Sequence, residues 1–265
     1  MRVQSLFIYP VKSLAGIEVS SFELDEFGPA GDRRWMLVND EEQFITQRQL
    51  PVLANVATRL GPEGVEIGIP GQGDFVLKPG NGRMAVKVWR DTVDALTGPE
   101  PADAAISRYL GQSLRFVYMP DESVRRVDPL RVPENRRVGF ADGFPLLITN
   151  QASLDELNSR LANAVDMRRF RPNVVISGAE AWSEDGWQSI TVGETRFAVA
   201  KPCSRCVMTT VDPDTGLKDP DTEPLRTLSR YRKTGDGVIF GQNVVHQSGG
   251  RLSVGDAVDI SQQES

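Results

Sequence analysis

The stretch "VEIGIPGQGDFVLKPGNGRMAVKVW", Val65 to Trp89, decides the fold class of this chain. Three of its segments, 65–69, 75–78 and 85–89, are rich in β-branched and aromatic residues, as strands are. Between them stand "IPGQG" and "KPGNGR", in which glycine, proline and asparagine favour turns. The stretch therefore predicts short strands of an antiparallel sheet or barrel.

The same pattern extends over most of the chain. Further strands are predicted at 2–9, 35–39, 114–119, 146–149, 173–177, 189–192, 195–200, 207–211, 238–245 and 257–260. The segment "VGET" at 192–195 is a plausible hairpin turn between two of them. Helices are predicted at 102–110, from a cap at Asn150 or Ser153 to Leu161, and at 224–232. We therefore expect a mainly β fold with a few helices, of the α+β class.

One polar segment interrupts the pattern. The residues 120–139, "PDESVRRVDPLRVPENRRVG", are rich in proline and arginine and are typical of a linker or mobile loop. We expect this segment to separate two domains, at residues 1–120 and 121–265.

The composition excludes several classes of function. The 265 residues are 40% hydrophobic and 25% charged, as in ordinary globular proteins. A formal net charge of −6 argues against nonspecific nucleic-acid binding, which needs a surplus of basic residues. Neither a signal peptide nor an apolar run near the ~20 residues of a membrane span is recognisable. We expect a cytoplasmic protein without nucleic-acid or membrane partners.

The chain has two cysteines, Cys203 and Cys206, in the stretch "AKPCSRCVMTTVDPDTG". A closed zinc site wants four Cys or His ligands, and only His246 could be added to this pair. A thioredoxin-like dithiol would cap a helix, but the β-branched run after Cys206 predicts a strand. Both readings are therefore disfavoured.

Two interpretations of the cysteines stay open from the residues alone. Free cysteines are among the most buried residue types, so both could be core residues. Lys201 and Arg205, however, flank the thiols, and basic neighbours favour the thiolate. One such thiolate at a strand end could bind a soft or transition metal that is held mostly by other groups.

Several long motifs together resemble one family. These are "IYPVKSLAGIEV" (8–19), "GDRRWMLVNDEEQFITQRQLPVLANV" (31–56), "DGFPLLITNQASLDELNSRL" (142–161), "FRPNVVISG" (170–178), "CSRCVMTTVDPDTG" (203–216), "PLRTLSRYR" (224–232) and "FGQN" (240–243). In this order and spacing they resemble MOSC-domain proteins, in the subgroup of the mitochondrial amidoxime-reducing component and its bacterial YcbX-like relatives. The resemblance implies an N-terminal β-barrel domain followed by a MOSC β-barrel domain.

The resemblance also implies a cofactor and its binding residues. Such proteins bind the molybdenum cofactor, a phosphate-bearing pterin dithiolene that carries the metal, and one protein thiolate completes the metal's ligand set. By motif position this thiolate is Cys206, whereas Cys203 is not a ligand. The implied cofactor contacts are Ser204 and Arg205 between the cysteines, Lys12, Ser13 and Arg33 at the phosphate, and Asp142, Arg171 and Asn173 at the pterin.

Some assignments depart from the family or stay open. Small hydroxyl residues often follow the aspartate in the family, but this chain has Gly143 and Phe144, which leaves backbone contacts there. Arg48 could bind the cofactor or form an ion pair within its domain, and Arg33 could pair with a nearby carboxylate. Besides Cys206, Asp214 in the following turn is a candidate catalytic residue, as a proton relay.

The implied function is a molybdenum-dependent oxidoreductase. In the family, N-hydroxylated compounds such as amidoximes, hydroxylamines and N-hydroxylated bases are reduced to amines or amidines. A [2Fe–2S] cluster needs four cysteines, so we expect electrons from a separate donor, namely a flavoprotein reductase, a ferredoxin or a cytochrome b5-like protein. The alternative is a carrier of the cofactor or of sulfur without redox turnover, with a persulfide on Cys206.

Overall fold

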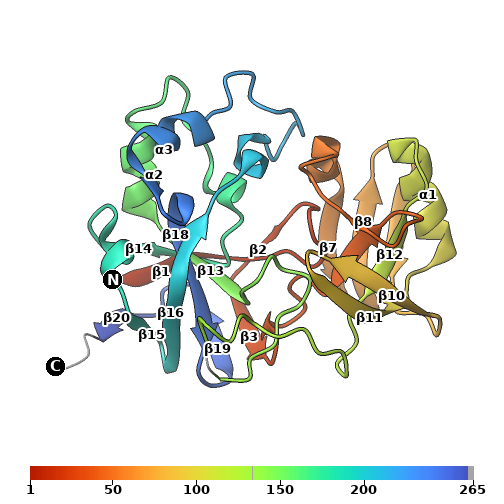
Figure 1. Ribbon diagram of the computed structural model, residues 1–265, viewed down its shortest axis with the longest axis horizontal. Coiled ribbons are helices and arrows are strands. Elements are labelled where there is room, and N and C mark those ends of the chain that lie inside the picture. Colours follow the sequence, from red (N-terminus) through yellow and green to blue (C-terminus); the bar gives the residue numbers. More distant parts are fainter. Residues whose placement is uncertain (133, 262–265) are drawn as a thin grey trace.

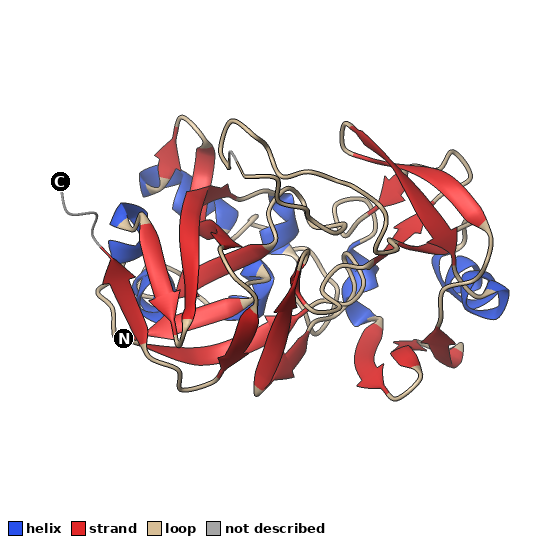
Figure 2. Cartoon of the chain, turned by 90° about the horizontal axis from the view of Figure 1, so that it is seen from below, coloured by secondary structure: helices blue, strands red, loops and turns tan. Residues whose placement is uncertain are grey.

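Strands dominate the structure. A computed structural model describes residues 1–132 and 134–261, and in these ranges short strands alternate with a few helices (Figure 1). This confirms the predicted mainly β class. The elements form two lobes, which lie side by side in Figures 1 and 2 with irregular loops between them. We call them the large lobe, with β1–β4, β13–β20, α2 and α3, and the small lobe, with β5–β12 and α1.

The large lobe is built on one nine-stranded sheet. All its pairs are antiparallel except β13 with β14, which run parallel. The strand order is β2 (Ile17–Val19), β1 (Arg2–Ile8), β14 (Val174–Ser177), β13 (Leu146–Asn150), β18 (Gly237–His246), β16 (Thr195–Ser204), β15 (Ser189–Val192) and β20 (Val258–Ser261), with β17 (Lys233–Thr234) paired to β18. The predicted turn at 192–195 joins β15 to β16, because Val192 pairs with Thr195.

Both faces of this sheet are covered. Val3, Leu6 and Ile8 of β1 point to one core. A three-stranded sheet of β19 (Gly250–Ser253), β3 (Ser21–Asp25) and β4 (Gly28–Pro29) contributes Phe22 and Leu252 to it. On the other face lie α2 (Gln151–Asn158) and α3 (Leu225–Tyr231), whose leucines pack on Phe170 and Phe240. The side chain of Asn150 caps α2 by accepting a hydrogen bond from the Ala152 amide, as predicted.

The small lobe has two sheets and one helix. Its five-stranded sheet has the order β10 (Arg83–Val88), β11 (Asp91–Thr97), β12 (Arg115–Tyr118), β5 (Trp35–Val38) and β6 (Phe44–Ile45). Its three-stranded sheet is β7 (Ala57–Gly61), β8 (Gly64–Ile69) and β9 (Gly73–Leu77). The strands predicted at 65–69 and 75–78 are β8 and β9, whereas the one predicted at 85–89 is β10 of the other sheet. Helix α1 (Glu100–Leu110) closes the core with Ala102, Ala105 and Ile106 and ends at Gly111 in a left-handed cap.

The large lobe is formed from both ends of the chain, and the small lobe from the segment between them. β1 pairs with β2 and β14, and β3 pairs with β19, so the strands of the first thirty residues belong to the large lobe, while Val11, Leu14 and Phe27 pack in the small lobe. The chain then builds the small lobe from β5 to the end of β12 at Tyr118 before it returns. The predicted boundary after residue 120 stays a prediction.

The segment after β12 has neither helix nor strand in its described part, but it is firmly anchored. The guanidinium of Arg125 is buried, forms an ion pair with Asp91 at 2.7 Å and donates to the carbonyl oxygens of Gly139, Ala141 and Asp142. These bonds fix the backbone that leads into β13. The segment therefore positions residues as well as connecting the lobes.

The strand predicted at 207–211 is wrong. Val207–Thr210 form a 3-10 turn (η4), in which the Thr209 and Thr210 hydroxyls donate to the Cys206 and Val207 carbonyls at 3.0 and 2.7 Å. Threonine side chains that bond to nearby backbone stabilise such a turn against the strand that β-branching favours. Three further 3-10 segments are η1 (Pro51–Asn55), η2 (Met167–Phe170) and η3 (Ser183–Gly186). None of the helices in the described ranges is both long and apolar enough to cross a membrane.

Candidate functional site

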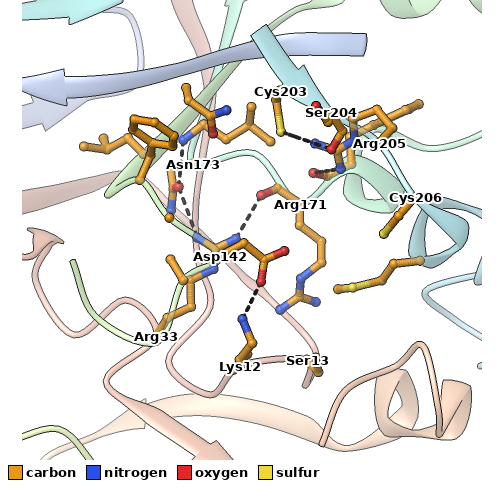
Figure 3. A pocket seen from close by; sticks show the side chains of 18 of the residues that line it. Lys12, Ser13, Arg33, Asp142, Arg171, Asn173, Cys203, Ser204, Arg205 and Cys206 are labelled. Atoms are coloured by element: carbon orange, nitrogen blue, oxygen red, sulfur yellow. Dashed lines mark hydrogen bonds and ion pairs between the residues drawn. The ribbon is translucent and has the colours of Figure 1, made fainter. Parts of the chain in front are cut away.

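A cavity of about 220 Å³ lies where the two lobes meet (Figure 3). Loops and strands from seven separate parts of the chain form it. Its lining consists of Lys12, Ser13, Arg33, Arg48, Ala141, Asp142, Gly143, Phe144, Leu146, Leu147, Arg169, Phe170, Arg171, Asn173, Cys203, Ser204, Arg205, Cys206, Met208 and Asn243. Six of these side chains are basic and one is a carboxylate, so the cavity is strongly cationic within an acidic chain.

The structure brings nearly all the predicted site residues together. All nine predicted cofactor contacts line the cavity, and so do Gly143, Phe144 and the open candidate Arg48. Asp214 does not belong to the lining. Its exposed carboxylate accepts two hydrogen bonds from Arg168, at 2.9 and 3.0 Å. We therefore withdraw the proton-relay role of Asp214.

The two cysteines are free thiols at the cavity wall. Each sulfur accepts a hydrogen bond from a different arginine: Cys203 Sγ from Arg205 Nη1 at 2.8 Å, and Cys206 Sγ from Arg48 Nε at 3.3 Å. Among the described residues no group of three or more His, Cys, Asp or Glu side chains could hold a metal ion.

Asp142 connects the cations of the cavity. It accepts from Lys12 Nζ at 2.6 Å, from Arg48 Nη2 at 2.9 Å and from Trp89 Nε1 at 3.3 Å. The side chain of Asp142 is 56% exposed, and Lys12 and Arg48 hold its pKa far below its usual range. Asp142 is therefore ionised at any physiological pH.

Lys12 is a buried cation whose interactions with its neighbours only partly offset the cost of its burial. Its side chain is 7% exposed, and Nζ also donates to the Phe140 carbonyl at 2.7 Å. Burial lowers the pKa of Lys12 to about 8, against the opposing effect of Asp142. Lys12 therefore carries its charge at neutral pH and loses it in mildly alkaline solution.

Two further cations stack on one aromatic ring. The guanidinium carbons of Arg33 and Arg171 lie 4.5 and 4.2 Å from the ring centroid of Tyr9. Arg33 also pairs with the buried Asp32 at 2.6 Å, so the expected alternative of a local ion pair is realised inside the site. Burial lowers the pKa of Arg171 to about 10, which leaves it charged at neutral pH.

Asn173 has a different task from the predicted one. Its amide nitrogen donates to Phe7 O and Asp32 Oδ1, and its oxygen accepts from Arg33 Nη1 and the Leu147 amide, all within 3.1–3.2 Å. These four bonds use the full capacity of an asparagine amide. Asn173 therefore positions Arg33 and has no free group for a pterin.

The backbone of the site is strained. Ser13, Arg33, Trp89 and Arg171 adopt φ values of 69°, 47°, 57° and 54°, a left-handed conformation that is rare outside glycine. They are four of the seven non-glycine residues with positive φ among those described. Such strain costs about 1–3 kcal/mol per residue and is concentrated at functional sites.

Three buried hydrogen-bond donors of the cavity have no partner within the described part of the chain, and they indicate the kind of ligand that would fit it. Ser13 Oγ, Arg171 Nη2 and Arg205 Nε are buried and have no hydrogen-bond partner among the described residues. Buried polar groups are normally satisfied, because an unmade bond costs about 1–3 kcal/mol. A ligand with phosphate-like oxygens would satisfy them, and both thiols line the same cavity. The donor set thus fits a phosphate-bearing cofactor whose metal accepts one thiolate.

Sequence reasoning missed several residues of the site. Arg169, Phe170, Met208 and Asn243 line the cavity, and Trp89 contacts its carboxylate from the tip of the β10–β11 hairpin. For Trp89 the local signal was "VWRD", in which a large aromatic residue ends a strand at a turn. Phe170, Met208 and Asn243 stand within the quoted motifs, which was a signal for them, and Arg169 directly precedes one of these motifs.

Comparisons with known proteins agree with the motif pattern. Residues 1–113 match the "MOSC N-terminal beta barrel domain" and residues 135–259 match the "MOSC domain". The chain is 33% identical to mitochondrial amidoxime-reducing component 1 of Mus musculus, over 97% of this chain and 81% of that protein. Component 1 of Homo sapiens is 33% identical and component 2 of Rattus norvegicus 34%, each over 97% of this chain and 82% of the relative. The chain belongs to the MOSC-domain family.

This membership confirms the resemblance drawn from the motifs. In this MOSC-domain protein both matched segments contribute to the cavity: Lys12, Arg33 and Arg48 come from the first, and Asp142 and Cys206 from the second. The cationic cavity is therefore a joint product of the two segments.

Proposed function

We propose that this MOSC-domain protein is a molybdenum-cofactor-dependent reductase of N-hydroxylated compounds. The observation that carries the proposal is the convergence of a thiol and six basic side chains from five chain segments on one cavity. The relatives named amidoxime-reducing components support the substrate class, which includes amidoximes, hydroxylamines and N-hydroxylated bases.

The residues divide the work of binding between them. Lys12 and Arg33 supply positive charge for the phosphate of the cofactor, and Ser13 Oγ is a free donor beside them. Arg171 Nη2, which has no partner among the residues described, is a free donor for the pterin. Arg205 Nε is a further free donor on the opposite wall, next to the thiols. Cys206 would supply the protein thiolate for molybdenum. Because the strained backbone already holds these groups in place, little ordering would accompany cofactor binding.

The reaction needs electrons from outside the chain. Reduction of an N-hydroxyl group consumes two electrons and two protons, releases water and leaves an amine or amidine. The bound cofactor would supply the two-electron chemistry, and the protein would bind and orient it. We propose a separate electron donor, namely a flavoprotein reductase, a ferredoxin or a cytochrome b5-like protein, because the two cysteines are too few for an iron–sulfur cluster.

Metal analysis tests the proposal. Protein purified from cells that make the molybdenum cofactor should contain close to one molybdenum per chain. Cys206→Ala should lose the metal, whereas Cys203→Ala, the matched control on the same wall, should keep it. A wild-type protein without molybdenum or pterin would overturn the proposal. A persulfide on Cys206 in such a protein would instead support the sulfur-carrier alternative.

A further inference from the structure

One contact crosses between the lobes to reach the candidate ligand. Arg48 follows β6 of the small lobe, and its Nε lies 3.3 Å from Sγ of Cys206, which follows β16 of the large lobe. The two residues are 158 positions apart in the sequence. The two matched family segments therefore meet at this sulfur.

The guanidinium of Arg48 is held by groups other than the sulfur. Nη2 donates to Asp142 at 2.9 Å, and the guanidinium lies 4.9 Å from the ring centroid of Trp89. The Arg48 carbonyl accepts from Lys218 Nζ at 3.2 Å, and its amide donates to Thr46 Oγ1 at 3.2 Å. These contacts hold Arg48 in place independently of Cys206. Its Nε–H therefore reaches the sulfur from a fixed direction.

The arginine at the other cysteine differs in this respect. Arg205 contacts Cys203 from two positions away in the sequence, so this contact is local to the end of β16. Arg48 instead belongs to the other lobe and approaches Cys206 from outside its loop. Of the two thiols, Cys206 is the one that accepts a hydrogen bond from an arginine of the other lobe.

We propose that Arg48 is a positioning residue for Cys206. Its Nε–H donates to Sγ, which fixes the direction of the sulfur at the cavity wall and places a positive charge beside it. The inference rests on the proposed function, in which this sulfur is a molybdenum ligand. Donors to a ligand sulfur are among the groups that set the reduction potential of a metal site, and a cation there favours the reduced state.

The first experiment uses the molybdenum-loaded protein and its Arg48→Gln variant. Redox titration followed by electron paramagnetic resonance should give a lower midpoint potential for the variant, with an altered spectrum of the metal. Arg48→Lys keeps the charge but lacks the guanidinium fork, so it should lie between the two. Arg59→Gln, at an exposed arginine of β7, should match the wild type. If Arg48→Gln does not fold, Arg48→Lys still decides.

The second experiment needs no cofactor. In a Cys203→Ser background, the rates of alkylation of Cys206 by anionic iodoacetate and neutral iodoacetamide are compared at one pH. Both reagents attack the thiolate, so their ratio is independent of the ionised fraction. Loss of Arg48 should lower the ratio about threefold, the Boltzmann factor for a unit charge about 6 Å away in water.

The outcomes separate the two hypotheses. Wild-type protein without molybdenum would contradict the proposed function, and the alkylation ratio would still test the Arg48–Cys206 contact. A loaded wild type whose midpoint potential is the same in Arg48→Gln would overturn the positioning role alone. An unchanged alkylation ratio would overturn it as well.

Discussion

Arg33 and Arg171 are two cations that share a hydrogen bond: Arg33 Nη2 donates to the backbone carbonyl of Arg171 at 3.1 Å. Both guanidinium groups also stack on the ring of Tyr9. Like charges this close repel each other, and the ring quadrupole of the tyrosine offsets part of that repulsion. The aromatic ring, and not the phenol, should therefore matter for the site.

Two substitutions of Tyr9 separate these contributions. Tyr9→Phe keeps the ring and removes a hydroxyl that has no partner among the described residues, so it should change the free energy of unfolding by less than about 1 kcal/mol. Tyr9→Leu removes the ring from a buried site and should cost about 2–4 kcal/mol. Urea denaturation measures both. Equal losses in the two variants would contradict the role of the ring.

Gly16 should be intolerant of a side chain for the same reason. A Cβ at this position would lie 2.3 Å from Cε1 of Tyr9, so the ring would have to move away from the two arginines. Gly16→Ala should destabilise the protein by about 1–3 kcal/mol and lower its molybdenum content. Gly235→Ala is the matched control, because no atom lies within 4 Å of its added Cβ. A Gly16→Ala protein as stable as this control would refute the packing argument.

The charge of Lys12 should make anion binding depend on pH. Burial lowers the pKa of Lys12 to about 8, so the site loses a positive charge as the pH rises through that value. Sulfate keeps its charge over this range, and its affinity for the cofactor-free protein, measured by calorimetry, should fall between pH 7 and 9. Lys12→Met should bind sulfate more weakly and without this decline, whereas the exposed Lys233→Met should behave as the wild type. If the sulfate affinity of Lys12→Met still fell between pH 7 and 9, a titrating group other than Lys12 would cause the decline.

Two aspartates should respond very differently to neutralisation. Asp142→Asn leaves Lys12 and Arg48 without their shared carboxylate and should cost about 2–4 kcal/mol of stability, most of it from the buried lysine. Asp214→Asn breaks an exposed pair with Arg168 and should cost less than about 1 kcal/mol and leave reductase activity unchanged. Thermal unfolding and amidoxime turnover test both statements. Loss of turnover in Asp214→Asn would reinstate the proton relay.

Turnover should require a second protein. With NADH or NADPH alone, the purified, molybdenum-loaded chain should not reduce an amidoxime, because we propose that electrons come from a separate donor. Addition of a flavoprotein reductase with a ferredoxin or a cytochrome b5-like carrier should start the reaction, as product chromatography would detect. Robust turnover with the nucleotide alone would contradict this expectation.

The sequence predicted many of the strands and the motif residues, but not how they meet, and it missed β3, β7, β11 and β19. Short β-branched runs between glycine- and proline-rich turns identified the strands β8, β9 and β10 within 65–89, and the long motifs identified many of the residues that line the cavity. At 207–211 local propensity failed, because threonine hydroxyls bond to the neighbouring backbone there. The saturated amide of Asn173 and the contact from Arg48 to Cys206 join distant segments, and local patterns carry no signal for such contacts.

The pairing of β1 with β14 has a consequence for biosynthesis. Arg2 pairs with Ser177, so the first strand emerges from the ribosome 175 residues before its partner, the difference of the two numbers. At about 5–20 residues per second this interval is roughly 9–35 s. The small lobe, whose strands all lie between residues 35 and 118, emerges entirely within that time. We therefore expect the small lobe to fold first and the large lobe, with the cavity, to close late in synthesis.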